Sequence, residues 1–193
     1  MLLASATAGL VSTIAAAEQG PAFDCKKATH EIEVLVCQDR GLAALDRTLT
    51  DRFRAAHANL SADQKRTLDA EQRGWIKGRN ECWKASQKRD CTEKQYTHRI
   101  VTLEARYGLA PVGRSTYYSC DDGKEDTLIF TPVSTDPPSA NVVRGNESET
   151  LILDRSGSGS KYLGDFGIVF WAKGDEALVE WPQGTEFSCK IRP

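Results

Sequence analysis

The chain has 193 residues, of which 40% are hydrophobic and 27% are charged, and its formal net charge is -2. This is enough for one or two domains with a packed core, and the mean hydropathy of -0.45 argues for a soluble protein. Residues 18–114 hold 18 Lys and Arg against 14 Asp and Glu, whereas residues 115–193 hold 7 against 13. The acidic second half disfavours nucleic acid, which needs a basic surface, and suits a cationic partner. An acidic surface that only keeps the protein in solution explains it equally well.

Residues 1–17 contain no charged side chain and end in Ala15, Ala16 and Ala17. This pattern predicts a secretory signal peptide with cleavage near Ala17–Glu18, although the basic segment that usually opens such a signal is absent. The segment is too short to span a bilayer comfortably. No Cys directly follows the small residues, so we expect neither a lipid anchor nor stable membrane insertion.

Six cysteines in an exported chain indicate three disulfides. Six cysteines permit fifteen pairings, so the connectivity stays open. Pairing neighbours along the chain gives Cys25–Cys37, Cys82–Cys91 and Cys120–Cys189. The alternative is a metal site, but the chain has no Cys-x-x-Cys, and its three histidines do not lie at zinc spacing from the cysteines. We therefore expect no metal ion and no cofactor.

Residues 22–108 have the pattern of a small helical domain. A short helical segment is expected between Cys25 and Cys37. Apolar residues recur at spacings of three and four from Leu42 to Leu60, which predicts an amphipathic helix.

Two capping patterns follow in the sequence. Ser61 with Gln64 forms a capping box, so the next helix should begin there and run to about Trp83. Thr92 with Gln95 repeats the pattern and predicts a further helix that ends near Tyr107, before Gly108 and Pro111.

Residues 109–115 contain Pro and Gly and predict a short linker. In residues 116–193, short apolar segments alternate with turn residues, which favours about eight strands in a closed antiparallel barrel or a sandwich. The fold class is therefore α+β with two domains, a small disulfide-pinned helical domain followed by a small antiparallel β-barrel. The candidate strands are 116–120, 126–131, 140–144, 149–154, 160–163, 167–172, 177–181 and 185–191.

Two motifs stand close together in the second half, Ser158-Gly-Ser-Lys-Tyr162 and Phe170-Trp-Ala-Lys-Gly-Asp-Glu176. Aromatic and β-branched residues favour a strand in the second motif, and Gly-Asp favours a chain reversal after it. The motifs predict two neighbouring loops joined by one strand. One loop would present the hydroxyl of Ser158, and the other would present the ammonium of Lys173.

These motifs, together with Cys120 and Cys189, resemble the MliC/PliC family of bacterial inhibitors of c-type lysozyme over about residues 115–193. The resemblance implies that Ser158 and Lys173 enter the active-site cleft of the enzyme. The neighbouring candidate contacts are Gly159, Lys161, Tyr162 and Gly174. The alternative is an ordinary turn serine and a solvated turn lysine, and Tyr162 and Trp171 fit packing in the barrel better than contact with a partner.

The first half resembles the LprI-type N-terminal domain of bacterial envelope proteins over about residues 22–107. Gln72, Trp75 and Arg79 fall on one helix face, where a packing role is a better explanation than a binding surface. The residues that carry the resemblance are Cys25, Cys37, Gln72, Trp75, Arg79, Cys82, Cys91, Tyr96, Arg99 and Ile100.

No catalytic motif such as Gly-x-Ser-x-Gly or a P-loop occurs, and all three histidines lie before residue 99, so we expect no enzyme. The resemblances imply a periplasmic inhibitor of c-type lysozyme, with loops carrying Ser158 and Lys173 that occlude the active site. The alternative is a non-catalytic protein-interaction module of the envelope, in which the helical domain is the main binding element. A homodimer is left open.

Overall fold

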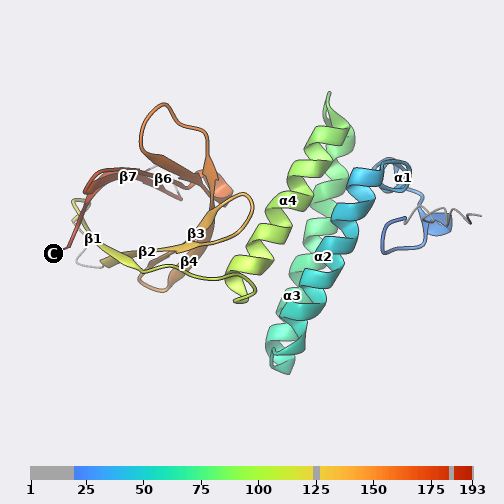
Figure 1. Cartoon of the computed structure of the whole chain (residues 1–193), viewed down its shortest axis with the longest axis horizontal. Coiled ribbons are helices and arrows are strands. Elements are labelled where there is room, and N and C mark those ends of the chain that lie inside the picture. The colour runs from blue at the N-terminus through green and yellow to red at the C-terminus, as the bar shows by residue number, and fades with distance from the viewer. Residues whose placement is uncertain (1–19, 124–126, 183–184, 193) are drawn as a thin grey trace, which may run out of the picture.

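The computed structural model describes residues 20–123, 127–182 and 185–192. The predicted signal peptide at residues 1–17 lies outside these ranges. Within them, four α-helices are followed by an eight-stranded closed barrel. Figure 1 shows the barrel beside the helices, with α4 next to the barrel and α1 farthest from it. The expected α+β fold class is confirmed.

The helices α1 to α4 form the first half. Their bounds are α1 Glu31–Gln38, α2 Arg40–Ala58, α3 Ala62–Asn80 and α4 Lys88–Arg106, with short 3-10 helices at Cys25–Lys27 (η1) and Glu81–Lys84 (η2). The predicted capping box at α3 is confirmed, since the backbone N–H of Ser61 donates to Gln64 Oε1 at 2.9 Å and Ser61 Oγ accepts from the Gln64 N–H. Buried apolar side chains from α1, α2, α3 and α4 share one core, made by Val36, Leu42, Leu49, Ala56, Leu68, Tyr96, Ile100 and Leu103.

The predicted start of the last helix at Thr92 is wrong, because α4 begins at Lys88. Thr92 lies in the second turn, fully buried, and its hydroxyl donates to the Lys88 carbonyl at 2.8 Å. A threonine inside a helix can satisfy its hydroxyl on the carbonyl four residues back, so the capping pattern is ambiguous there. Helix α3 also ends at Asn80, three residues earlier than expected, and the chain continues as η2.

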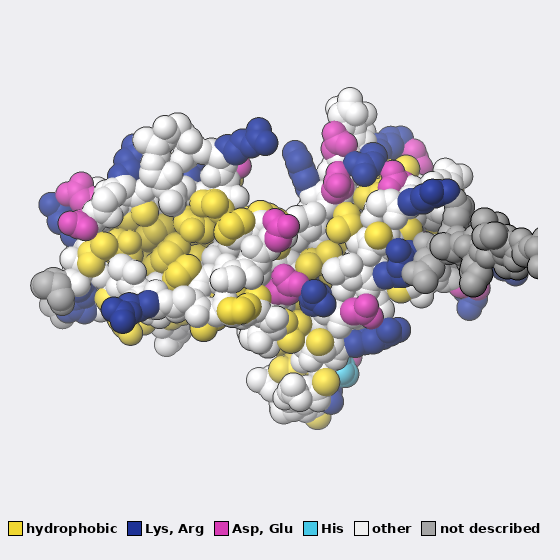
Figure 2. All heavy atoms as spheres, viewed as in Figure 1, with side chains coloured by type: hydrophobic (Ala, Val, Ile, Leu, Met, Phe, Trp, Pro, Cys, Tyr) yellow, Lys and Arg dark blue, Asp and Glu magenta, His cyan; other side chains and the backbone are white. Residues whose placement is uncertain are grey.

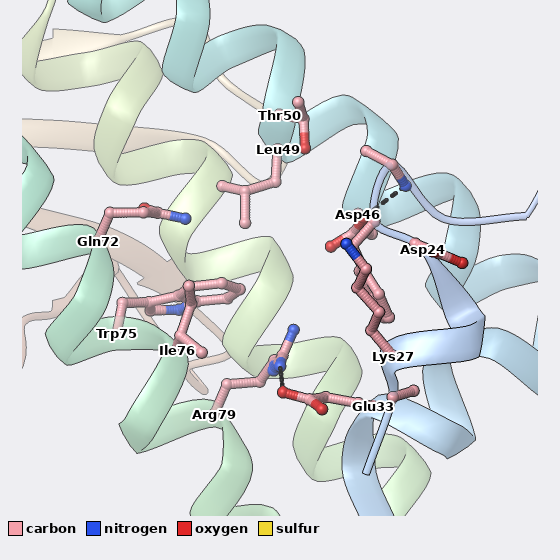
Figure 3. Close-up of a pocket in the computed structure, with 13 residues that line it drawn as sticks. Asp24, Lys27, Glu33, Asp46, Leu49, Thr50, Gln72, Trp75, Ile76 and Arg79 are labelled. Carbon is pink, nitrogen blue, oxygen red and sulfur yellow. Dashed lines mark hydrogen bonds and ion pairs between the residues drawn. The ribbon is translucent and has the colours of Figure 1, made fainter. Parts of the chain in front are cut away.

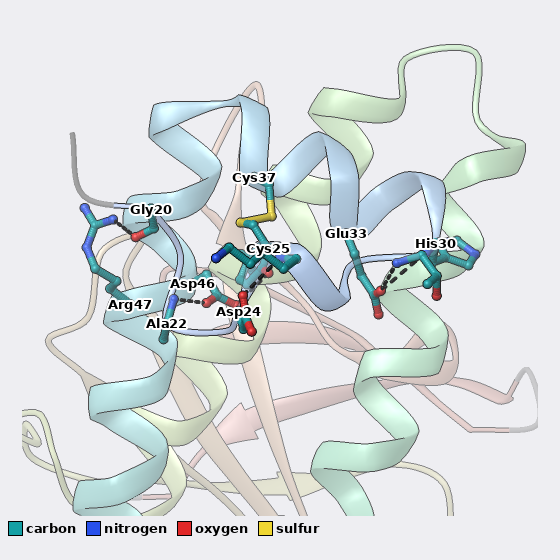
Figure 4. The surroundings of a disulfide bond; sticks show 12 residues. Gly20, Ala22, Asp24, Cys25, His30, Glu33, Cys37, Asp46 and Arg47 are labelled. Carbon is teal, nitrogen blue, oxygen red and sulfur yellow. Dashed lines mark hydrogen bonds between the residues drawn. A yellow bond between two sulfur atoms is a disulfide. The ribbon is translucent and has the colours of Figure 1, made fainter.

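Three disulfides pin the fold, and they join the pairs that neighbour pairing gives. Cys25–Cys37 joins η1 to α1, Cys82–Cys91 joins η2 to α4, and Cys120–Cys189 lies in the barrel. Figure 4 shows the first of these beside the segment that leads into η1. That segment is fixed on α2, because the N–H of Ala22 donates to Asp46 Oδ2 at 2.8 Å.

Each strand of the barrel pairs antiparallel with the next, and β8 pairs with β1. Cys120 and Cys189 lie opposite each other in that closing pair, so their disulfide joins the two ends of the barrel sheet. The strands are β1 Thr116–Cys120, β2 Thr127–Val133, β3 Ser139–Arg144, β4 Glu147–Asp154, β5 Ser160–Leu163, β6 Val169–Lys173, β7 Glu176–Trp181 and β8 Thr185–Ile191.

Aromatic side chains fill the inside of the barrel. Phe170 stacks on Phe130 with the ring centroids 4.7 Å apart, and Tyr118 meets Phe170 edge-on at 5.4 Å. Such pairs add about 0.5–1.5 kcal/mol beyond the area that they bury. A rigid core of this kind fixes the strands from which the surface loops project.

The segment between the two halves is tied to the barrel. The Gly113 N–H donates to the Pro132 carbonyl at 2.8 Å, and Val112 forms a bridge with Val133 of β2. The predicted linker therefore lies along β2 instead of running free.

Helix α4 packs against β3 and β4. The side-chain amide of Asn141 on β3 donates to the Ala105 carbonyl of α4 at 3.0 Å, and His98 lies 3.7 Å from Asp165. In the described part of the chain, no helix is long and apolar enough to cross a membrane.

Candidate functional site

The register of β5 and β6 brings the two predicted loops together. Ser160 lies opposite Ala172, so the chain before Ser160 meets the turn after Lys173 at the same end of the barrel. Both Ser158 and Lys173 are exposed. The structure thus places a hydroxyl-bearing loop directly beside a lysine-bearing turn, as the motifs predict.

Two glycines make this close approach feasible. Gly159 has a φ of +68°, and a Cβ at this position would lie 2.2 Å from the Ala172 carbonyl oxygen and 2.9 Å from Lys173 Cγ. Gly174 has a φ of +61° in the two-residue turn between β6 and β7. A hairpin turn of this length needs a positive φ at its first central residue in the type II′ form, where glycine is preferred.

Trp171 holds the serine loop in place from the outer face of the barrel. Phe170 is buried inside, so the alternation of the strand turns Trp171 outward. Its indole N–H donates to the Ser158 carbonyl at 2.8 Å. The Ser156 hydroxyl lies 2.9 Å from the Gly159 carbonyl oxygen and 3.1 Å from that of Ser158, and it donates between them. The loop is therefore anchored through the carbonyls of Ser158 and Gly159, while the Ser158 side chain is exposed.

The ammonium of Lys173 lies on the indole ring, with Nζ 3.6 Å from the ring centroid. Lys161, the cross-strand neighbour of Trp171, places its Nζ 5.7 Å from the same centroid. A cation over an aromatic face gains about 0.5–1 kcal/mol at an exposed site. Among the described residues, no carboxylate lies within ion-pair distance of Lys173 or Lys161. The surface formed by the loop at 156–161 and the turn at 171–175 is called the tip below. It is thus locally cationic, on a barrel whose sequence is acidic.

The turn after Lys173 is fixed by the last strand. The Ile191 N–H donates to the Asp175 carbonyl at 2.9 Å, and Lys190 pairs with Glu176 at 2.9 Å, which raises the pKa of Lys190. A depression of about 210 Å³ lies beside this turn and is lined by Trp171, Lys173, Glu176, Ala177, Leu178 and Ser188. The Lys173 side of the tip therefore has a fixed backbone and a shallow hollow next to it.

Tyr162 differs from the other predicted site residues, because it packs inside the barrel. It lies opposite Phe170 and meets Phe130 edge-on, with the ring centroids 5.1 Å apart. Burial raises the pKa of the Tyr162 phenol. Tyr162 supports the loop from within, so the packing explanation given for it above fits the structure better than a role in contact.

Comparison with protein families covers both halves of the chain. Residues 25–110 match the family described as "Lysozyme inhibitor LprI", and residues 118–187 match "Membrane-bound lysozyme-inhibitor of c-type lysozyme", MliC. The helical half therefore resembles the LprI family, and the barrel resembles the MliC family. Both families are described as inhibitors of an enzyme, in agreement with the expectation that this chain is not itself an enzyme.

Two curated relatives span most of the chain, and one solved structure matches part of it. The proteins named Lipoprotein LprI from Mycobacterium bovis and Mycobacterium tuberculosis are 27% identical over 173 residues, covering 89% of this chain and 84% of theirs. The crystal structure of Pseudomonas aeruginosa MliC in complex with hen egg white lysozyme is similar at 26% identity and a TM-score of 0.33, covering 43% of this chain and 86% of that one. The mycobacterial relatives are named lipoproteins and the MliC family is described as membrane-bound, which associates both with the cell envelope.

In the LprI-type half, Arg79 and Trp75 have the packing role favoured from the sequence. Arg79 is 3% exposed, and its Nη1 donates to the Tyr96 hydroxyl at 2.7 Å, which in turn donates to Asp46 Oδ1 at 2.9 Å. The indole of Trp75 meets the Tyr96 ring edge-on at 5.2 Å. Burial raises the pKa of Tyr96, so this phenol stays neutral and can donate to the carboxylate.

The same face of α3 also lines a cavity of about 410 Å³ beside α2 and the segment before α1. Figure 3 shows Gln72, Trp75, Ile76 and Arg79 on one wall of it. Gln72 Oε1 accepts from Arg99 Nε at 3.0 Å, so this residue too has a structural partner. Among the described residues, no group of His, Cys, Asp and Glu is arranged to hold a metal ion.

Proposed function

We propose that this protein inhibits c-type lysozyme in the periplasm by placing the Ser158 loop and the Lys173 turn in the active-site cleft of the enzyme. The match of the barrel to the MliC family supports the enzyme class. The observation that carries the proposal is that the Ser158 loop and the Lys173 turn lie next to each other. An exposed serine and a lysine without a carboxylate partner in the described chain lie side by side at one end of a rigid barrel.

The chemistry of the tip suits the chemistry of the cleft. Lysozyme uses two carboxyl groups, of which one is a protonated acid in an apolar pocket and the other is ionised. The Lys173 ammonium supplies a positive charge and three donors, and the Ser158 hydroxyl can donate and accept. Charge-assisted hydrogen bonds in a desolvated cleft contribute about 1.5–3 kcal/mol each. Such an inhibitor needs no catalytic group, because it only has to fill the cleft and exclude the sugar.

The tip is ordered before any partner arrives, and this lowers the cost of binding. The Ser158 carbonyl accepts from the Trp171 indole, and the Lys173 ammonium rests on the same indole ring. Immobilising a flexible side chain on binding costs about 0.5–1.5 kcal/mol. Contacts already present in the free protein reduce this cost for the Lys173 side chain and for the backbone of the Ser158 loop.

The test is the double variant Ser158→Ala with Lys173→Ala in the full chain. We expect inhibition of cell-wall lysis by c-type lysozyme in a turbidity assay to weaken at least tenfold, because both polar contacts to the cleft are removed. Thermal unfolding should stay nearly unchanged, since both side chains are exposed. A matched control is Ser148→Ala with Lys77→Ala, which alters an exposed serine and an exposed lysine outside these loops.

A double variant that inhibits at full strength would rule out this tip as the site. That result would favour the second candidate, an envelope interaction module whose helical half is the main binding element. The cavity lined by Trp75 and Ile76 supports this candidate, because Ile76 is 37% exposed at its wall. Absence of inhibition by the unaltered protein would remove the inhibitor proposal itself.

A further inference from the structure

We infer that α4 supplies a second contact surface for the same enzyme, along the groove between this helix and the barrel. The inference rests on the proposed function, and it assigns to the LprI-type half a direct part in binding. The groove has a volume of about 790 Å³. One wall is the N-terminal part of α4, with Asp90, Lys94 and Thr97, and the other is formed by the ends of β4 and β5. Figure 2 shows the molecule hollowed between the barrel and the helices.

The groove and the tip belong to one continuous outer surface. Leu151 is fully buried in the barrel, so alternation along β4 turns Ile152 and Asp154 outward. Asp154 lies opposite Lys161, and Lys161 lies opposite Trp171. Side chains paired in this way on one face have Cβ atoms about 4.5–5.5 Å apart. A row of neighbouring positions on the outer face therefore leads from the groove to the indole that carries Lys173.

The tip alone is small for a specific protein complex. A stable interface of standard size covers about 800 Å² on each partner and involves roughly 20–30 residues a side. The loop at 156–161 and the turn at 171–175 supply only part of that. An enzyme that receives the tip extends beyond it, and the groove next to Lys161 is a further hollow that the surface of the enzyme would meet.

The composition of the groove resembles that of protein interfaces. Pro137, Ile152 and Leu163 give it apolar lining, and charged side chains stand around them. An apolar centre with a polar rim is typical of protein contacts. Carboxylates outnumber cations on the lining, although Arg89 of α4 pairs with Glu93 at 2.7 Å and lies 3.8 Å from Asp90. The remaining negative charge suits a basic partner.

Helix α4 and the barrel are joined beside the groove. Asn141 of β3 donates to the Ala105 carbonyl, and His98 of α4 lies 3.7 Å from Asp165, which follows β5. Thr150 Oγ1 donates to the Asn141 side-chain oxygen at 2.9 Å and orients that amide. An arrangement fixed in the free protein presents both walls to a partner at little ordering cost.

The experiment compares Thr97→Arg with Thr67→Arg in the full chain. Thr97 lines the groove on α4, whereas Thr67 is exposed on α3 and lines none of the hollows described above. The arginine at position 97 should obstruct the groove and raise the dissociation constant for hen egg white lysozyme at least tenfold, as measured by calorimetry. The arginine at position 67 should leave it unchanged. Thermal unfolding of both variants controls for folding, and Thr97→Gln replaces Thr97→Arg if the larger side chain lowers the melting temperature.

The outcomes separate this inference from the function on which it rests. If Ser158→Ala with Lys173→Ala weakens binding and both position-97 variants bind like the unaltered protein, the groove has no part in binding and the inhibitor proposal stands. If the unaltered protein does not bind the enzyme at all, both fail. Weak binding by Thr97→Arg with normal binding by Thr67→Arg supports a contact on α4.

Discussion

At the scale of single residues, Trp171 organises the tip of the barrel. Its ring supports the ammonium of Lys173, and its N–H holds the loop of Ser158. One side chain thereby sets the relative position of two groups that come from different loops. The indole lies on the outer face of the barrel, so it can hold these two groups without being taken from the barrel core.

Gly159 provides a direct test of how closely the two loops must approach. In Gly159→Ala the new Cβ would collide with the Ala172 carbonyl, and the φ of +68° disfavours any side chain. We expect the free energy of unfolding to fall by about 1–3 kcal/mol and inhibition to weaken more than tenfold as the loop shifts. Urea unfolding and the lysis assay measure the two effects.

The matched control for this substitution is Gly157→Ala in the same loop. Nothing lies within 4 Å of a Cβ at Gly157, so this variant should behave like the unaltered protein. Equal inhibition by Gly159→Ala and Gly157→Ala would show that the close approach of the loops does not matter for binding.

The sequence predicted which residues form the tip but not how they are held. Ser158 and Lys173 are adjacent as expected, because their motifs flank one hairpin. The packing explanation for Trp171 overlooked the alternation of β6, in which a buried Phe170 requires an outward Trp171. The hydrogen bond to the Ser158 carbonyl has no local signal, since it depends on the path of a loop thirteen residues away.

At the scale of elements, the start of α2 depends on Asp39. Its Oδ1 accepts from the Leu42 N–H at 2.9 Å, and Oδ2 accepts from Arg89 Nε at 2.9 Å. The bond from Leu42 lowers the pKa of Asp39, and Arg89 acts in the same direction. One carboxylate thus caps α2 and ties it to α4.

We expect Asp39→Ala to reduce the free energy of unfolding by about 1 kcal/mol at neutral pH, the usual cost of losing a helix cap. The lowered pKa means that the folded state binds a proton less readily than the unfolded state. The contribution of Asp39 is therefore present above the unfolded pKa of about 3.9 and is lost as the pH falls through the folded value. Denaturant unfolding at pH 7 and at low pH should show the difference between variant and unaltered protein shrinking in acid.

The exposed Asp51 in the middle of α2 supplies the control, because Asp51→Ala removes a carboxylate that is not a cap. That variant should show little change at either pH. A difference for Asp39→Ala that stays constant or grows in acid would contradict the role given to this carboxylate.

The elements were predictable where one physical signal dominates. The strands at 160–163 and 185–191 were predicted with the bounds that the structure has, since turn residues mark both ends of the first and precede the second. The start of α4 was not, because Thr92 can donate to the Lys88 carbonyl as readily as it can cap a helix. A threonine on its own does not distinguish the first turn from the second.

At the scale of the whole molecule, the helical half is attached to the barrel along α4. The contact uses Asn141 on the barrel and the Ala105 carbonyl on the helix. No sequence pattern predicted this, since it joins a polar side chain on a strand to a backbone group more than thirty residues earlier. The attachment leaves the tip with Ser158 and Lys173 exposed. It also places α4 along the groove that lies beside the tip.

The central claim is that the tip of Ser158 and Lys173 occupies the cleft in which lysozyme binds sugar. The most direct measurement is competition, in which the affinity for c-type lysozyme is determined with increasing amounts of a chito-oligosaccharide that fills the cleft. The account predicts mutual exclusion, with the apparent dissociation constant rising linearly with the saccharide concentration from its value without saccharide. An affinity that does not change when the cleft is saturated with saccharide would contradict it.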